Sequence, residues 1–296
     1  MSTSPIKTFT EQGADHLERA HTTGSISMSP EMFEQLYLAP HSRVKGDLRQ
    51  KLGNPTPLAL GGFLLCTTPA SMALLGWHGA GGFGAGANVG AYFWFGGLLM
   101  LLGSIGEWIL GNTFPSVLFG LFGGFWFTFG STIVPDYNAY GLYSKTDVVA
   151  DGLKEAEFYS TFSFFLISMG ILCAVFAVAS IRTNVVLFTI LVILVPCCKL
   201  PNTPATRFIA DSFTTVGCLS ASFFAVANGE SAKSLTYQHA GAAILFVVSL
   251  LGWYIFLSHI LLSVDFPYVL PLGDLSSRIP GATKVKKDTH SEEEKV

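Results

Sequence analysis

The chain has 296 residues, of which 50% are hydrophobic and only 12% are charged, and its mean hydropathy is +0.49. A soluble globular protein would have too little charged surface at these values, so the composition excludes that class and favours a membrane protein. The net charge of -3 and the pI near 6.1 argue against nucleic acid as a partner, because no basic stripe is present.

The N-terminal part of the chain differs from the rest of it. Residues 1–52 are polar and mixed in charge, and they lack the basic segment and the apolar core of a signal peptide. We expect a disordered cytoplasmic tail here, with the first spanning helix acting as the insertion signal. Residues 56–78 carry no acidic or basic charge, and their length fits the roughly 20 residues that a helix needs to cross about 30 Å of hydrocarbon.

Further apolar segments occur along the chain. The complete set lies at 56–78, 88–110, 114–135, 158–181, 185–227 (interrupted) and 240–262. The predicted fold class is therefore an all-α polytopic membrane protein, a six-transmembrane-helix bundle within residues 53–270. Glycines recur at close spacing in the second and third spans, and small residues let membrane helices approach backbone to backbone. We expect a tight bundle.

The charges beside the spans predict the orientation of the chain. Basic residues precede the first span, from Arg43 to Lys51, and recur in the tail at 271–296. The loop between the third and fourth spans is acidic on balance, as suits an exterior loop. With an even number of spans, both termini are cytoplasmic, and residues 271–296 form a cytoplasmic C-terminal tail.

The fifth apolar segment is interrupted. Its two halves, 185–194 and 213–227, are each too short to cross, and the stretch between them holds three prolines and three charged residues. Removing residues 195–212 would leave one span of about 25 residues. The pattern favours an insertion at 195–212, of the kind that read-through of untranslated sequence produces. A discontinuous helix, or a seventh span that begins near Phe208, is the alternative.

Two polar features of the spans are candidates for a solute site. Asn54, Pro55 and Thr56 place rigid φ angles and an amide at the mouth of the first span, where freed backbone groups could meet a polar solute. Simple helix initiation explains the same residues equally well. Glu107 lies well inside an apolar stretch, which indicates either an interior carboxylate that relays a proton or an interfacial one that snorkels or pairs.

The remaining reactive side chains do not indicate an enzyme. No serine or cysteine lies in a recognised nucleophile context, and the five cysteines show neither a disulfide framework nor a zinc pattern. His78, His239 and His259 suit the membrane interface better than a functional site. The segment GGFGAG at 81–86 lacks the lysine and the setting of a phosphate loop, so we expect a flexible exterior linker. We expect no catalysis, cofactor or metal site.

Several motifs together resemble one known family. Asn54 to Phe63, NPTPLALGGF, is similar to the NPxPLGLxxF signature of the acetate uptake transporter family, the acetate and succinate permeases of fungi and bacteria. The likeness continues through GNTF at 111–114, FGGFW at 122–126 and LPLGDLS at 270–276. It covers nearly all of the chain from Asn54 to Ser277, and it is closest to a fungal branch.

The resemblance implies six helices per protomer, a hexamer, and a solute path with a hydrophobic constriction in each protomer. Carried over by motif, the constriction falls on Phe63, Phe122 and Leu194. Phe122 stands where the family usually shows tyrosine, which removes a hydroxyl from the path. Ala59 also replaces a glycine of the signature.

Transport of a small acid is the function that these features predict. The spans hold no arginine or lysine outside 195–212, so a bare carboxylate would lose its hydration with no cationic partner. With the resemblance, this favours proton-linked passage of acetate or a similar short monocarboxylate across the plasma membrane. Asn54 and Thr56 are the expected polar contacts, and Glu107 is the expected proton relay. Export of ammonia or ammonium, and a membrane sensor or scaffold of acid stress, are the alternatives.

Overall fold

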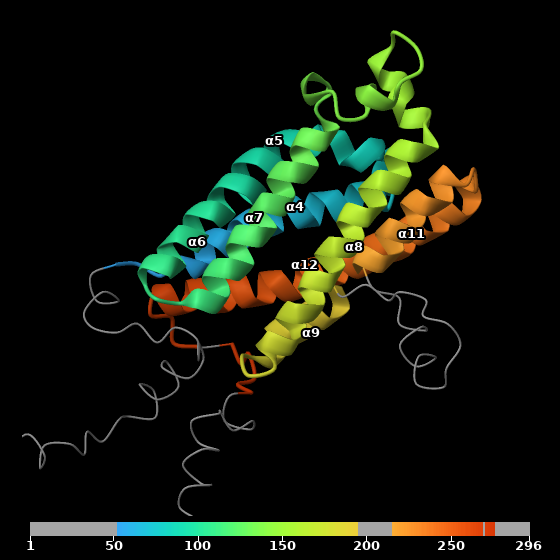
Figure 1. The fold of residues 1–296 in the computed structure, drawn as a ribbon. Helices are drawn as coiled ribbons and strands as arrows, with labels where there is room; N and C mark the ends of the chain where they lie inside the picture. The colour runs from blue at the N-terminus through green and yellow to red at the C-terminus, as the bar shows by residue number, and fades with distance from the viewer. Residues whose placement is uncertain (1–51, 195–214, 269, 276–296) are drawn as a thin grey trace, which may run out of the picture. The chain divides into compact units, whose positions relative to one another are not determined.

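The computed structural model describes residues 52–194, 215–268 and 270–275, and this part of the chain is built from helices and turns (Figure 1). Within it, five helical segments are long and apolar enough to cross a membrane. They are Thr56–Leu74, Phe83–Ile109, Thr113–Ile133, Ala156–Ser180 and Ser231–Ser263. The predicted class, a helical membrane protein, is confirmed, whereas a sixth span does not occur as one continuous helix in the described residues.

Each of the long segments corresponds to one of the predicted spans. The elements are α4 (Thr56–Leu74), η2 (Phe83–Asn88), α5 (Val89–Ala91), the π-helical η3 (Tyr92–Leu99), α6 (Met100–Ile109), α7 (Thr113–Ile133), α8 (Ala156–Ser180), α9 (Val185–Leu194), α11 (Thr215–Ala227) and α12 (Ser231–Ser263). The second span joins η2, α5, η3 and α6 into one segment. The last helix begins earlier than the apolar segment at 240–262, because its first residues are polar and the hydropathy pattern does not detect them.

The start of α4 shows how its prolines act. Pro55 is the N-cap residue, and Pro57 lies in the first turn. A proline in the first turn has a fixed φ that suits a helix, and the N–H group that it lacks would have no partner within the helix. The Asn54 side chain accepts a hydrogen bond from the Thr56 backbone N–H at 3.1 Å. Asn54 and Pro55 therefore take part in helix initiation, as one of the two interpretations of this motif expected.

Small residues bring the second span against its neighbours. A Cβ atom built on Gly103 would lie 2.5 Å from the Cβ of Ala59, and one built on Gly62 would lie 2.5 Å from the backbone oxygen of Phe95. Such distances leave no room for a side chain, so α4 contacts η3 and α6 through their backbones. The tight packing predicted from the glycine spacing is confirmed at these contacts.

The two short apolar helices share their neighbours. Both α9 and α11 pack against α8 and α12. In α11, the Ser222 hydroxyl donates to the backbone oxygen of Ser234 in α12 at 2.9 Å. The predicted insertion at 195–212 lies outside the described residues. What the structure describes is two short helices packed against the same pair of long ones.

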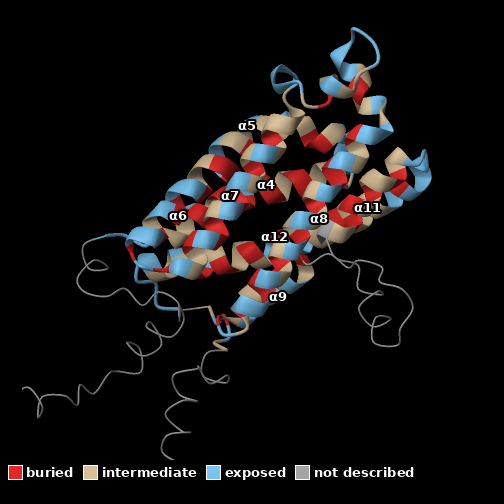
Figure 2. Cartoon of the chain, in the orientation of Figure 1, coloured by how far each residue is buried: buried red, intermediate tan, exposed pale blue. Residues whose placement is uncertain are grey.

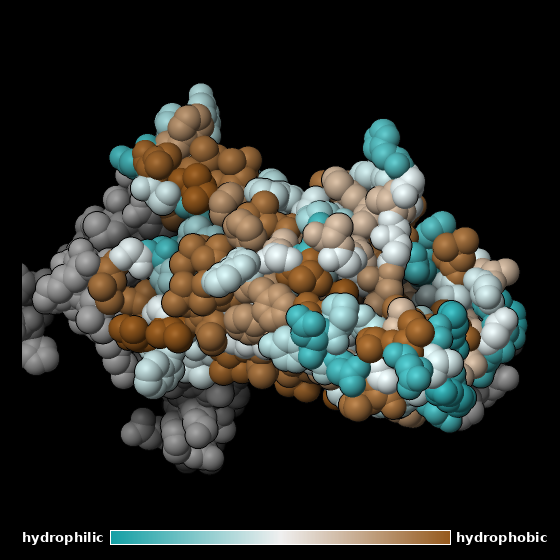
Figure 3. Space-filling model, turned by 90° about the horizontal axis from the view of Figure 1, so that it is seen from above, coloured by the Kyte–Doolittle hydropathy of each residue, from teal (hydrophilic) through white to brown (hydrophobic). Residues whose placement is uncertain are grey.

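The side chains are sorted as a lipid environment requires. Buried residues gather where the helices face one another (Figure 2). Large apolar side chains occur on the outer faces, including Trp94, Trp108 and Val178, which are 67%, 73% and 70% exposed. Figure 3 shows a broad apolar surface on one face of the molecule. In water such a surface would promote aggregation, whereas it is suited to contact with the hydrocarbon of a membrane.

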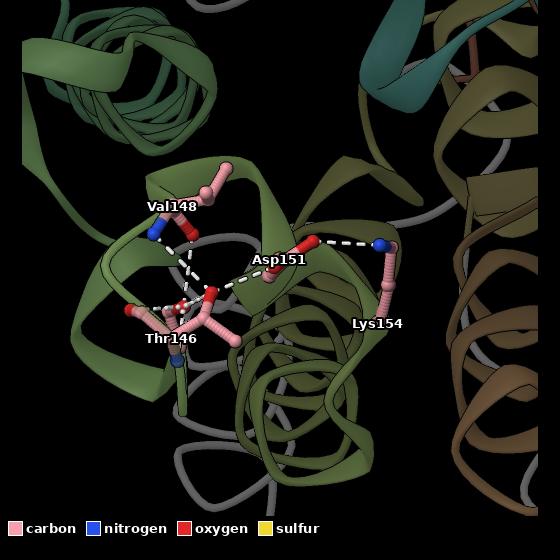
Figure 4. A network of polar contacts seen from close by, with 5 residues as sticks. Thr146, Val148, Asp151 and Lys154 are labelled. Carbon is pink, nitrogen blue, oxygen red and sulfur yellow. Dashed lines mark hydrogen bonds and ion pairs between the residues drawn. The ribbon is translucent and has the colours of Figure 1, made fainter.

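The connection between α7 and α8 is a polar structure with its own hydrogen bonds (Figure 4). Thr146 donates from its hydroxyl to Asp151 at 2.6 Å, and Lys154 pairs with Asp151 at 2.6 Å. The Lys154 hydrogen bond holds the pKa of Asp151 below its ordinary value, with a further contribution from Thr146. The same bond raises the pKa of Lys154. This connection carries the acidic balance that predicted an exterior loop.

The segment at 270–275 folds back onto the turn between α8 and α9. The Val185 N–H donates to the oxygen of Gly273 at 2.8 Å, and the Leu275 N–H donates to the oxygen of Thr183 at 3.0 Å. Leu272 is only 3% exposed. The LPLGD motif is therefore packed against the helices, although the sequence boundary at 271 assigned most of it to a tail.

Candidate functional site

Thr56 and Glu107 form a buried polar cluster at the start of α4. The Thr56 hydroxyl donates to Glu107 Oε1, and Asn112 Nδ2 donates to Glu107 Oε2 at 2.7 Å. Glu107 is fully buried and Asn112 is 2% exposed. The structure thus shows a buried carboxylate that pairs with its neighbours, as the interfacial interpretation allowed, and not one that snorkels. Its role as a proton relay stays a prediction. Asn112 Oδ1 has no hydrogen-bond partner among the described residues.

Thr56 also lines a small cavity, which we call the Thr56 cavity. Its volume is about 120 Å³, and residues of α4, α6, α7, α9 and α12, with the turn before α9, form its wall. The polar lining residues are Thr56, Thr183, Asn184 and His259. Glu107 is not among the lining residues, so it meets this cavity through the Thr56 hydroxyl.

Three helices begin at the Thr56 cavity. Thr56 is the first residue of α4, Phe114 and Pro115 belong to the first turn of α7, and Asn184 directly precedes α9. Asn184 caps that helix, because its Oδ1 accepts the Leu187 N–H at 2.8 Å. No lining residue comes from the last turn of α6, α8 or α12. The positive ends of three helix dipoles therefore converge on this cavity, which favours an anion.

A larger cavity, the Tyr92 cavity, lies between the opposite ends of the same helices. Its volume is about 350 Å³, and nine of the residues that form its wall are aromatic. Two polar groups of its wall are used within the protein: the Tyr92 hydroxyl donates to the oxygen of Gly84 at 3.0 Å, and Gln238 Nε2 donates to the oxygen of Leu74 at 3.0 Å. Trp126 also lines this cavity, and its Nε1 has no hydrogen-bond partner among the described residues. This cavity offers space and apolar surface more than polar recognition.

Phe63, Phe122 and Leu194 line both cavities. The rings of Phe63 and Phe122 lie edge to face with their centroids 6.1 Å apart. The ring of Phe176 stacks on that of Phe122, with 6.3 Å between the two centroids. Phe122 is 8% exposed and Leu194 is 5% exposed. The structure thus brings together, at the boundary between the two cavities, the three side chains that the family resemblance assigned to a constriction.

Asn54 and Pro55 are placed differently. Asn54 is exposed and Pro55 is half-buried, and neither lines a cavity. Pro55 packs closely on Gly106, where an added Cβ would lie 2.6 Å from the proline Cβ. Of the proposed mouth residues, Thr56 alone reaches the space that a solute could occupy.

The glycine-rich segment at 81–86 covers the far side of the Tyr92 cavity. Phe83 lines this cavity, and its ring contacts Tyr159 and Phe223 at centroid distances of 6.1 and 6.3 Å. Gly84 and Ala85 are buried. The sequence predicted a flexible linker here, which is wrong for the buried residues of this segment. The packing was missed because the neighbours come from distant parts of the chain and leave no local signal in the sequence. Phe83, the aromatic residue among these glycines, was the one local feature that could have indicated a packed segment.

His259 is the second residue that sequence analysis placed elsewhere. It lines the Thr56 cavity together with Gly252 and Ile255 of the same helix. These positions are three and four residues apart, as one face of a helix requires. That spacing was readable from the sequence, but the nearby end of the apolar segment suggested an interfacial histidine.

The charge of the cavity walls is low. No Asp, Glu, Lys or Arg lines either cavity within the described residues. The same part of the chain holds no group of three or more side chains that could bind a metal ion. The geometry suits a small, neutral or transiently neutralised solute.

Comparison with known proteins agrees with this geometry. A family model described as the GPR1/FUN34/yaaH family matches residues 38–200. Protein alcS of Aspergillus fumigatus is 40% identical over 282 residues, which cover 92% of this chain and 95% of that protein. The acetate transporter protein patA of Aspergillus clavatus is 30% identical over 227 residues, covering 76% of this chain and 79% of that protein.

A more distant relative and a solved structure complete the comparison. Ammonia transport outward protein 2 of Saccharomyces cerevisiae is 28% identical over 152 residues, covering 49% of this chain and 48% of that protein. The structure of the bacterial acetate channel SatP matches with a TM-score of 0.51 and 20% identity, covering 75% of this chain and 99% of that chain. The likeness to SatP shows a shared fold.

Proposed function

Because this chain belongs to the GPR1/FUN34/yaaH family, we propose that it carries acetate or a similar short monocarboxylate across the plasma membrane in a proton-linked manner. The observation that carries the proposal is the pair of cavities separated by Phe63, Phe122 and Leu194. The names of patA and SatP, an acetate transporter and an acetate channel, support the choice of solute.

The two ends of the path would act in sequence. At the Thr56 cavity, three helix N-termini and the Thr56 hydroxyl attract the carboxylate. The constriction is apolar, so the solute would cross it as the neutral acid, which avoids most of the cost of burying a charge. Glu107 would relay the proton through Thr56. Asn54 would act through the start of α4, where its side chain accepts the Thr56 N–H.

Assembly and location are part of the proposal. We infer a hexamer in which each protomer keeps its own path, with both chain ends in the cytoplasm. The start of α4 and the last part of α12 line the same cavity, which is consistent with two flanking segments on one side of the membrane. Native mass spectrometry and labelling of each tail from either side of the membrane test these two points.

Flux measured in proteoliposomes tests the transport proposal. Acetate, succinate and ammonium are compared side by side against protein-free vesicles, since acetic acid also crosses lipid unaided. We expect acetate to move faster in the presence of the protein, and succinate and ammonium to gain less. Equal acetate flux with and without protein would exclude the proposal.

Export of ammonia is the second candidate. An apolar aromatic constriction would pass neutral ammonia, and the ammonia transport relative belongs to the same comparison. The convergence of positive helix ends argues against the ammonium cation at the Thr56 cavity. Alkalinisation of the medium without acetate would favour this candidate.

A membrane sensor of acid stress is the remaining alternative. If the protein is a sensor, deletion of residues 1–40 would abolish acid adaptation and leave flux intact.

A further inference from the structure

We propose that the Trp126 indole N–H is a second solute-binding group, which holds the carbonyl oxygen of a neutral carboxylic acid in the Tyr92 cavity. This inference rests on the proposed function and adds a site on the other side of the constriction. Trp126 lines the Tyr92 cavity and is 5% exposed, and its Nε1 has no hydrogen-bond partner among the described residues. An indole N–H can only donate, so an acceptor atom alone can satisfy it.

The other tryptophans of the chain do not share this feature. Trp253 is partly buried, and its Nε1 donates to the Thr68 hydroxyl at 3.0 Å. Trp77, Trp94 and Trp108 are exposed. A buried N–H without a partner costs free energy, because the bilayer core holds no water that could replace the lost hydrogen bond. Such a group requires an explanation, and a solute that brings an acceptor atom provides one.

The ring of Trp126 is held in place by its neighbours. It stacks on the ring of Tyr92, with 5.0 Å between the centroids and 22° between the planes. A Cβ atom built on Gly96 would lie 2.5 Å from Trp126 Cγ, so the indole packs directly on the backbone of the second span. A donor that is held in this way loses little freedom when it binds. Neighbouring side chains cover the nitrogen, so an acceptor reaches it when one of them moves aside.

Trp126 follows the constriction along α7. It lies four residues after Phe122, so the two side chains share one face of the helix, about 6 Å apart along its axis. Phe122 lines both cavities, whereas Trp126 lines only the Tyr92 cavity. A solute that passes Phe122 into this cavity therefore enters the space beside Trp126.

The surroundings of the indole favour the neutral acid. No Asp, Glu, Lys or Arg of the described residues lines this cavity, so a carboxylate would lose its hydration with no cation beside it. A protonated carboxyl group keeps a carbonyl oxygen that accepts from Trp126. Gln238 binds Leu74 through its Nε2, so its Oε1 is an acceptor on the same wall for the O–H of the acid. Ammonium offers only N–H donors and cannot bond to an indole N–H.

The indole N–H resonance of Trp126 tests this contact directly. Wild-type protein with isotope-labelled tryptophan in nanodiscs is titrated with sodium acetate, and with sodium chloride as the reference, at about pH 5, where part of a simple carboxylic acid is protonated. Trp126→Phe and Trp253→Phe assign the two resonances. We expect the Trp126 proton to move downfield and to saturate, as a hydrogen bond forms. The Trp253 proton, which is already bonded to Thr68, should not move.

A Trp126 resonance that stays in place during the acetate titration would overturn the inference. An equal movement in ammonium chloride would overturn it as well, since that salt supplies no carbonyl oxygen. So would an equal movement at about pH 8, where acetate is almost wholly the anion.

The concentration dependence of acetate flux distinguishes a binding role of Trp126 from a packing role. Trp126→Phe keeps an aromatic ring and removes the N–H, and Trp253→Phe is the matched control, because Trp253 lines neither cavity. We expect the half-saturating acetate concentration to rise about fivefold for Trp126→Phe at unchanged maximal flux, as one hydrogen bond is lost. The control should keep the wild-type value. An unchanged half-saturating concentration in Trp126→Phe would contradict the inference.

Failure of this inference and failure of the transport proposal give different results. Wild-type protein that carries acetate while its Trp126 resonance stays in place contradicts only the inference. Absence of acetate flux in wild-type protein contradicts the proposed function, whatever the resonance shows.

Discussion

The two cavities differ in what they offer a solute. The Thr56 cavity is about 120 Å³ and places helix starts, a hydroxyl and a histidine around its space. The Tyr92 cavity is about 350 Å³, and hydrogen bonds within the protein already occupy Tyr92 and Gln238. The helix starts and the Thr56 hydroxyl therefore lie on one side of the constriction, and the other side is a larger, mainly apolar chamber in which Trp126 Nε1 is the polar atom without a partner among the described residues. Substitutions at the two ends should have different consequences.

Glu107→Gln should give the largest effect, because it removes the carboxylate that is bonded to Thr56 with little change of shape. We expect acetate flux to fall by about a hundredfold, the usual scale for losing a positioned proton-transfer group. Thermal stability should change little, since an amide can still bond to Thr56 and Asn112. Flux in proteoliposomes and the Tm together check this. A large loss of Tm with proportional loss of flux would indicate a purely structural carboxylate.

Phe122→Ala should alter selectivity at the boundary between the cavities. Removing the ring widens the constriction, so we expect the ratio of succinate to acetate flux to rise about tenfold. Phe125→Ala is the control, because Phe125 lies on the same helix and lines only the Tyr92 cavity. If both variants change the ratio equally, the constriction is not at Phe122.

Thr56→Val and Thr67→Val compare one substitution in the two cavities. Thr56 donates to Glu107, whereas the Thr67 hydroxyl donates to the backbone oxygen of Phe63 within its own helix at 2.7 Å. We expect acetate flux to fall about fivefold for Thr56→Val, the scale of about 1 kcal/mol for one hydrogen bond, and to change little for Thr67→Val. The reverse order would place the hydroxyl that meets the solute in the Tyr92 cavity.

Tyr92→Phe should affect stability more than selectivity. It removes the hydrogen bond that ties Gly84 of η2 to Tyr92 of η3 within the second span. We expect the free energy of unfolding to fall by about 1 kcal/mol. The order of acetate, succinate and ammonium flux should be unchanged. A changed order would mean that the Tyr92 hydroxyl also takes part in recognition.

Asp151→Asn should leave transport unchanged, because it lies in the loop between α7 and α8. The pKa of Asp151 is lowered by Lys154, so this contact stabilises the loop above the ordinary aspartate pKa and is lost as pH falls through the lowered value. We expect faster hydrogen exchange of residues 144–154 in the variant at neutral pH. In strong acid the variant and wild type should exchange alike. Equal exchange at neutral pH would show that the contact does not order the loop.

Local patterns in the sequence were enough to find five of the predicted spans and to allow an interior position for Glu107. Length and lack of charge located the helices, and the apolar surroundings of Glu107 allowed an interior position. Phe83 and His259 were assigned to other roles because their neighbours come from α8, α11, α4 and α9, and such contacts have no local signature. The positions of Phe63, Phe122 and Leu194 depended on the family resemblance, since periodicity does not distinguish a gate from a core.

Reversible blockage of the constriction tests most directly whether the solute passes between the two cavities. Phe63→Cys places a thiol at the boundary, and a small disulfide-forming reagent then fills the space. Wild-type protein treated in the same way controls for the native cysteines. We expect acetate flux through the variant to stop on modification and to return on reduction. Undiminished flux through the fully modified variant would show that the solute takes another route.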